Sequence, residues 1–146
     1  MKTLLFLALG FGSNAQAFDD IINGSDTPES SYPSAGGILL SGVVPWGGTT
    51  YELKLLMCTG TLIAPDVVLL AAHCLDLDSV QAQAGIEFSS MDLVFSRQAD
   101  LSSFTSGFAT EWPDDAVFAW EGVGHEGFSM YSLQMGLAEN DDIGLL

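Results

Sequence analysis

The sequence predicts an all-β fold, a small antiparallel barrel, and three observations lead to this prediction. Short apolar or alternating stretches recur between turn-forming residues, and no stretch shows a convincing helical period. Apolar residues at positions 51, 53, 55 and 57 alternate with Glu52 and Lys54, as expected for a strand with one face in water. The chain also contains 16 glycines, which suits the many tight turns of a small barrel.

The first three strands are expected in the N-terminal half of the chain. Residues 34–41 form the first, and the turn region Pro45-Trp46-Gly47-Gly48 follows it. Residues 51–63 extend the alternating stretch into a second strand. Residues 67–72 are a continuous apolar run, which is typical of a strand with little solvent exposure.

The later part of the chain is less regular. Weaker strands are expected at residues 80–88 and 116–123, and a further strand opens at residues 143–146. Between them, the stretch from Ser89 to Asp115 is rich in Ser, Asp and Gly and predicts a loop region.

Length and charge limit the classes of protein to consider. A chain of 146 residues with 48% hydrophobic residues is expected to form one folded domain. The net charge is −16, and Lys2, Lys54 and Arg97 are the basic residues. Such a surface repels nucleic-acid phosphates and anionic membranes, so neither is an expected partner. The acidity indicates solubility, a preference for cationic substrates, or adaptation to acid or salt.

Residues 1–17 have the pattern of a secretory signal peptide. Lys2 gives a positive start, residues 4–11 form a short apolar core, and Ala15-Gln16-Ala17 is a small-x-small cleavage pattern. The core is much shorter than the roughly 20 residues that span a bilayer. We therefore expect a secreted, extracellular protein that is soluble after cleavage.

Export makes a disulfide the expected state of the two cysteines. Cys58 and Cys74 lie 16 positions apart (74 − 58), and an oxidising compartment favours their pairing. A loop of this size is stabilised by roughly 3 kcal/mol in the chain-entropy model. Free or metal-bound thiols are the alternative, but two cysteines alone do not complete a zinc site, so no metal is expected.

Four ordered motifs resemble those of a known family. They are Ile21-Ile22-Asn23-Gly24, Cys58-Thr59-Gly60-Thr61-Leu62-Ile63, Leu70-Ala71-Ala72-His73-Cys74 and Asp142-Ile143-Gly144-Leu145-Leu146. The trypsin-like serine proteases of the chymotrypsin fold carry similar runs at the mature N-terminus, in the strand before the catalytic histidine, at that histidine and at the catalytic aspartate. The order of histidine before aspartate also agrees with this family.

The resemblance implies catalytic roles for His73 and Asp142. His73 would be the general base, because imidazole titrates near working pH, and Asp142 would fix its tautomer. Asp141 competes with Asp142, since only one of two successive strand residues can face His73, but the register of the motif favours Asp142. A histidine beside a disulfide and a solvated acidic turn are the plainer alternatives. The run of residues 124–128 around His125 resembles a surface turn of the family, which implies a structural role for His125.

The third member of the triad, the nucleophilic serine, is absent from the chain. The family places it in Gly-Asp-Ser-Gly-Gly, and this sequence contains no such run. The resemblance therefore implies that residues 21–146 are the N-terminal part of the peptidase domain, the first of two β-barrels. The missing C-terminal barrel would supply the serine, the oxyanion hole and the specificity pocket.

Further expectations follow from the same resemblance. Residues 18–20 would be an activation peptide, with Ile21 as the mature N-terminus. The 69 positions between His73 and Asp142 (142 − 73) exceed the usual spacing, so residues 89–115 would be an insertion, either an enlarged surface loop or a loop that contacts substrate.

The expected function is serine-type endopeptidase activity on proteins or peptides, without a cofactor. The chain by itself would be inactive, because it lacks the nucleophile. The alternative is a secreted, non-catalytic homologue of such proteases that binds or inhibits a partner.

Overall fold

The computed structural model describes residues 29–107, 109–136 and 140–146. The expected signal peptide (1–17), activation peptide (18–20) and mature N-terminus at Ile21 lie outside these residues. Among the described residues, no helix is long and apolar enough to span a membrane.

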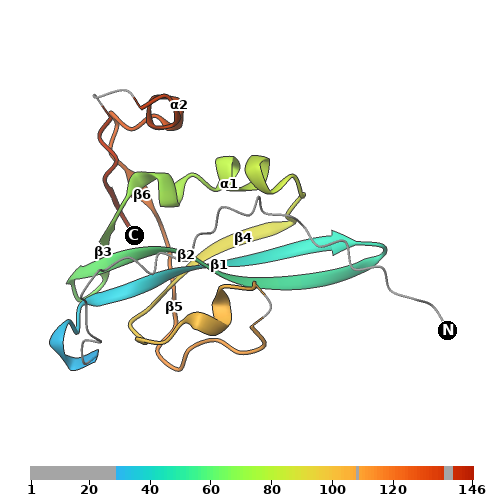
Figure 1. Ribbon diagram of the computed structural model, residues 1–146, viewed down its shortest axis with the longest axis horizontal. Helices are drawn as coiled ribbons and strands as arrows, with labels where there is room; N and C mark the ends of the chain where they lie inside the picture. Colours follow the sequence, from blue (N-terminus) through green and yellow to red (C-terminus); the bar gives the residue numbers. More distant parts are fainter. Residues whose placement is uncertain (1–28, 108, 137–139) are drawn as a thin grey trace, which may run out of the picture.

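One antiparallel sheet dominates the described chain (Figure 1). Its neighbours follow the order β5-β4-β1-β2-β3-β7-β6, and every pair is antiparallel. The strands are β1 (Ala35–Trp46), β2 (Thr49–Ala64), β3 (Val67–Leu70), β4 (Ser90–Ser96), β5 (Val117–Phe118), β6 (Val123–Gly124) and β7 (Gly144–Leu145). The predicted all-β class is confirmed at this level.

The sheet is curled into a half-barrel, and the connection between its edges shows why. β5 and β6 are the two edge strands, yet only residues 119–122 join them. From Phe118 to Val123 the chain takes five Cα steps of about 3.8 Å, so it spans at most about 19 Å. The edges of a flat sheet with this many strands would lie about 29 Å apart. The sheet must therefore bend to bring its edges together.

The β1–β2 hairpin forms the longest part of the sheet and extends to the right in Figure 1. Its turn consists of Gly47 and Gly48, with φ of 60° and 81°. Positive φ at both positions defines a type I′ turn, which matches the twist of the flanking strands. Pro45 and Trp46, expected in the turn region, are instead the last residues of β1.

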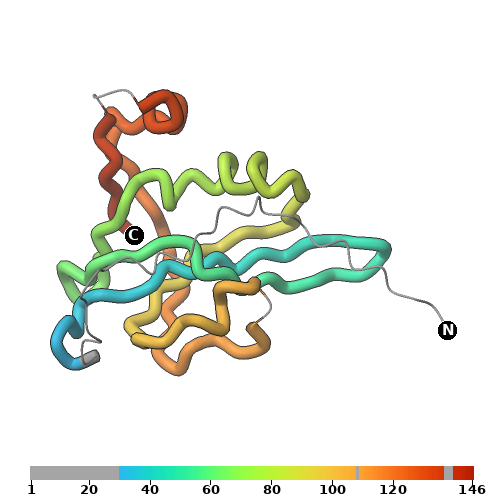
Figure 2. The backbone as a smooth tube through the Cα atoms, in the orientation of Figure 1, coloured from blue at the N-terminus to red at the C-terminus, as the bar shows by residue number. Residues whose placement is uncertain are grey.

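Both faces of β1 and β4 are buried. On one face, Ile38, Leu40, Leu93 and Phe95 form a core with Val68, Leu70 and Cys74, and residues from α1 (Leu77–Ala84) pack against it. On the other face, Leu39 and Val94 are fully buried beneath Leu101 and Phe104. Figure 2 shows α1 and the 97–116 segment on opposite sides of the sheet.

The prediction of a strand at residues 80–88 is wrong, because most of this stretch belongs to the helix α1. Asp76 caps the helix: its carboxylate accepts hydrogen bonds from the Ser79 N–H (3.0 Å) and hydroxyl (2.8 Å). Gly85, with φ of 64°, ends the helix in the left-handed conformation. These two end signals outweigh the weak apolar run between them.

The prediction that residues 89–115 form a loop is wrong for the first part, which is β4, an inner strand between β1 and the edge strand β5. The remainder covers the outer face of the sheet, and the short 3-10 helix η3 (Ser102–Phe104) lies within it. Lys54 of β2 holds this cover in place, because its Nζ donates a hydrogen bond to the Thr110 carbonyl (2.7 Å) and lies 5.1 Å from the Trp112 ring centroid.

Three short helical segments complete the described chain. They are η1 (Glu29–Ser31), the 3-10 turn η2 (Ala72–Leu75) and α2 (Met130–Gln134). The sequence analysis expected none of them. The expected strands at residues 116–123 and 143–146 are shortened to two-residue pairings in β5, β6 and β7.

Candidate active site

His73 lies at the turn that follows β3. The chain leaves the sheet after Leu70, and η2 begins at Ala72, so that His73 stands in its first turn. The next residue, Cys74, forms a disulfide with Cys58 of β2. This confirms the predicted pairing, and it ties the histidine turn to the neighbouring strand.

The pairing of β7 with β3 places Asp142 close to His73. Leu70 of β3 is opposite Gly144 of β7. Continuing this antiparallel register by two residues in each direction places Asp142 opposite Ala72, the residue before His73. Pairing of residues distant in sequence thus brings the two motifs together.

The carboxylate of Asp142 binds His73 at two points. Asp142 Oδ2 lies 2.7 Å from His73 Nδ1, and Oδ1 accepts a hydrogen bond from the His73 backbone N–H at 2.8 Å. An ionised carboxylate only accepts hydrogen bonds, so Nδ1 carries the proton in this contact. In the neutral ring, Nε2 is then left with a lone pair that can take a proton.

The surroundings of Asp142 favour its ionised form. Burial raises the pKa of the carboxyl group, but hydrogen bonds from the His73 ring and from backbone N–H groups of His73 and Ala72 lower it, as does the charge of the ring. The net result is a pKa below the ordinary aspartate value. Asp142 is therefore a carboxylate that can stabilise an imidazolium at His73.

Asp141 faces away from this pair and toward the other histidine. Its Oδ2 lies 3.3 Å from His125 Nδ1, and its side chain is 64% exposed, against 23% for Asp142. Of the two neighbouring acids, Asp142 is thus the one that contacts His73. The sequence analysis did not foresee the His125–Asp141 contact, although the presence of two aspartates and two histidines was a signal for it.

A surface pocket of about 480 Å³ lies beside His73. Leu56, Met57, Cys58 and Thr59 of β2 line it together with Ala71, His73 and Cys74. The His73 side chain is 41% exposed. No serine is among the described residues that line this pocket, so they offer no candidate for the expected nucleophile.

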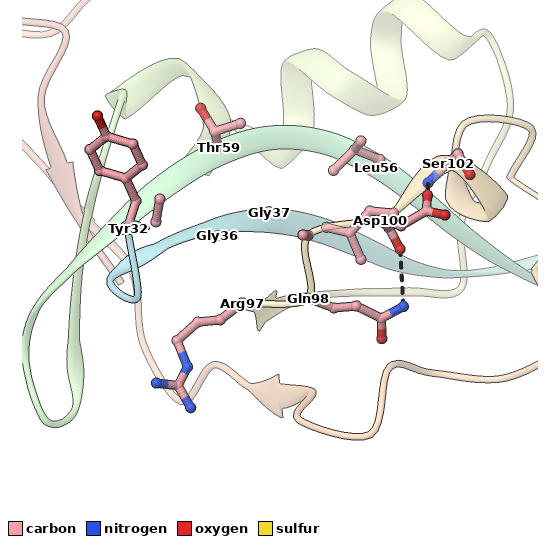
Figure 3. A pocket seen from close by; sticks show the side chains of 12 residues that line it. Tyr32, Gly36, Gly37, Leu56, Thr59, Arg97, Gln98, Asp100 and Ser102 are labelled. Carbon is pink, nitrogen blue, oxygen red and sulfur yellow. Dashed lines mark hydrogen bonds between the residues drawn. The ribbon is translucent and has the colours of Figure 1, made fainter. Parts of the chain in front are cut away.

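A second pocket of about 510 Å³ shares Leu56 and Thr59 with the first (Figure 3). Asp100 lies on its rim, where Oδ1 accepts a hydrogen bond from the Ser102 N–H at 3.0 Å. Gln98 Nε2 donates to the Asp100 carbonyl, also at 3.0 Å. Hydrogen bonds from the Ser102 side chain and backbone lower the Asp100 pKa. The pocket lining therefore carries one acidic side chain, Asp100, and one basic side chain, Arg97.

One group of three potential metal ligands gathers among the described residues. The sulfurs of Cys58 and Cys74 and a ring nitrogen of His73 lie within 4.8 Å of one another. Because the two sulfurs are bonded to each other, they are not available as thiolate ligands. The chemistry of this donor set is therefore that of a disulfide beside an imidazole.

No protein-family model matches the chain, and no curated protein matches it at a significant level. The likeness to trypsin-like serine proteases thus rests on the four sequence motifs.

Proposed function

We propose that this chain provides the histidine and aspartate of a serine endopeptidase of the trypsin-like class. The observation that carries the proposal is the contact of 2.7 Å between His73 Nδ1 and Asp142 Oδ2, with the second carboxylate oxygen on the His73 amide. A histidine oriented in this way by a half-buried acid is the arrangement that activates a hydroxyl nucleophile.

In the proposed reaction, His73 Nε2 takes the proton of a serine hydroxyl as the oxygen attacks the peptide carbonyl. The resulting imidazolium gives that proton to the leaving amine, and an acyl-enzyme remains. Water then repeats the sequence, with His73 again acting first as base and then as acid. Asp142 stays ionised throughout and stabilises the imidazolium.

The serine would come from a second barrel, because the chain lacks the Gly-Asp-Ser-Gly-Gly run. An exposed apolar face supports such a partner. Val123, Ile143 and Leu145 are 57%, 47% and 44% exposed, and they line a pocket of about 470 Å³ together with His125. Apolar side chains gathered on one surface are typical of an interface.

The disulfide supports an exported protein, since such bonds persist in oxidising compartments. The pocket in Figure 3 supports a peptide substrate, because an extended chain that passes from His73 over Thr59 would meet it. The net charge of −16 favours substrates with basic side chains.

A serine-directed phosphonate probe tests the proposal. The protein captured from its source with an antibody against this chain is expected to be labelled, and the 146-residue chain alone is expected to remain unlabelled. When the gene is changed to encode His73→Ala, the protein captured from the same source should no longer be labelled. If the captured protein is never labelled, the alternative of a non-catalytic, partner-binding homologue is favoured instead.

A further inference from the structure

Two histidine–carboxylate contacts lie next to each other in the described chain. Asp142 Oδ2 is 2.7 Å from His73 Nδ1, and Asp141 Oδ2 is 3.3 Å from His125 Nδ1. Each of these consecutive carboxylates contacts its own imidazole.

The backbone around the two aspartates is held in a compact form. The Asp142 N–H donates to the Asn140 carbonyl at 2.9 Å, and the Ile143 N–H donates to the Asp141 carbonyl at 2.8 Å. These are two successive three-residue turns. They fix the angle between neighbouring side chains, so a constraint on Asp141 is transmitted to Asp142.

The turn that carries His125 supplies such a constraint. The His125 N–H donates to the Ile143 carbonyl at 2.8 Å, which extends the β6–β7 ladder to the residue after Asp142. On the other side, the Ser129 N–H donates to Asn140 Oδ1 at 2.9 Å. The segment with both aspartates is therefore anchored at each end by the same turn.

Gly127 completes this contact. A Cβ at this position would overlap the Asp141 carboxylate, so only glycine lets the acid lie against the turn beside His125. The Gly127 N–H donates to His125 Nδ1 at 3.1 Å when that nitrogen carries no proton, whereas a protonated Nδ1 faces Asp141 Oδ2, so the two contacts alternate with the protonation of the ring.

We propose that His125 and Asp141 are positioning residues for the His73–Asp142 pair: by holding one carboxylate away from His73, they direct the other toward it. The inference rests on the proposed function, in which His73 is the base. Both side chains are well exposed, 49% and 64%, so their contact adds little to overall stability. Their effect is on the orientation of the Asp142 carboxylate relative to the His73 ring.

The test is an NMR pH titration of the His73 ring in the full 146-residue chain. A carboxylate beside an imidazole stabilises its protonated form, so Asp142→Asn should lower the titration midpoint of His73 relative to the wild type. His125→Gln should lower it in the same direction, by about 0.3–0.5 unit, because Asp142 is then less well directed. Loss of a positive charge alone would have the opposite effect and raise the midpoint.

Gly127→Ala provides a second variant in which every charge is kept. Its methyl group displaces Asp141, and the His73 midpoint is again expected to fall. Glu126→Gln is the matched control, since it removes a charge from the same turn without touching the pair, and it should shift the midpoint by less than 0.2 unit, roughly the scale of an exposed charge.

The outcomes separate the two proposals. If Asp142→Asn leaves the His73 midpoint unchanged, the proposed function itself is wrong. If Asp142→Asn lowers the midpoint while His125→Gln and Gly127→Ala leave it unchanged or raise it, the function stands and the positioning role is overturned. Unfolding of one variant is detected in the same spectra, and the other variant then decides.

Discussion

Asp142 fixes both the ring and the backbone of His73, through contacts of 2.7 Å to Nδ1 and 2.8 Å from the amide N–H. One side chain therefore sets the tautomer of the imidazole and holds the 3-10 turn η2 that carries it. A change at Asp142 should alter catalysis and local stability together, whereas a change at the adjacent Asp141 should not alter them to the same extent.

The first prediction follows from the proposed function and concerns Asp142→Asn in the captured protein that reacts with the probe. An asparagine amide that faces Nδ1 can donate a hydrogen bond there, which favours the tautomer with its proton on Nε2 and leaves no base for the serine. In the Ser-His-Asp template, this replacement lowers kcat by about 10⁴-fold. We expect a loss of similar size in hydrolysis of a peptide ester. Asp141→Asn is the control, and an equal loss there would contradict the assignment.

The second prediction concerns the pH dependence of stability. The folded-state pKa of Asp142 lies below the ordinary value, so the folded state binds the proton less tightly than the unfolded chain. The stabilisation from this group is then fully present above about pH 4 and is lost as the pH falls through the folded-state pKa. Urea unfolding from pH 2 to 7 should show that the difference in the free energy of unfolding between the wild type and Asp142→Asn becomes smaller toward low pH. A difference that becomes larger there would contradict the prediction.

The sequence predicted the centre of the molecule best where the pattern was local. Alternation at residues 51–57 and the apolar run from Val67 predicted the strands β2 and β3. The expectation that Lys54 faces water is wrong, because the covering segment leaves it only 7% exposed, whereas Tyr51 is 51% exposed. The pairing of Cys58 with Cys74 followed from their spacing and number.

Other parts could not be predicted because their stabilising contacts are distant in sequence. Ser90–Ser96 reads as irregular, yet it becomes an inner strand of the sheet because it pairs with β1. Residues 101–112 lack a regular pattern but cover the outer face through Leu101 and Phe104. For α1, the signals at Asp76 and Gly85 were present, and an apolar run between them was given too much weight.

At the candidate site, the motifs paired His73 with Asp142 but did not show how the fold brings them together, nor that Asp141 lies against His125. The contact between His73 and Asp142 depends on the register of β3 and β7, which no local pattern specifies. The contact between Asp141 and His125 depends on a turn whose role is visible only when Gly127 is seen against the carboxylate.

The third prediction concerns the disulfide. Replacing Cys58 and Cys74 together with alanine should lower the free energy of unfolding by about 3 kcal/mol, since the loop between them is then unconstrained in the unfolded chain. Denaturant unfolding of the wild type in the presence of a phosphine reductant serves as a control and should match the double variant. A wild type that is unaffected by complete reduction would contradict this account.

The fourth prediction compares two of the basic residues. Lys54 is only 7% exposed, and its Nζ donates to the Thr110 carbonyl while facing the Trp112 ring. Lys54→Met keeps the length of the side chain but removes this charged hydrogen bond, and should cost about 1.5–3 kcal/mol. Faster hydrogen exchange of the residue 54 amide should accompany the loss, because its backbone N–H donates to the Gly107 carbonyl of the covering segment at 3.1 Å.

Arg97→Met is the matched control for Lys54→Met, since each variant removes a single positive charge from a strongly acidic chain. Arg97 Nε lies 3.9 Å from Asp115 Oδ2, and its side chain is 52% exposed, so solvent screens the pair and its loss should cost less than about 0.5 kcal/mol. If the two variants lose equal stability, net charge rather than the buried contact accounts for the effect. A large loss confined to Lys54→Met would instead show that one buried ammonium group holds the 101–112 segment against the outer face of the sheet.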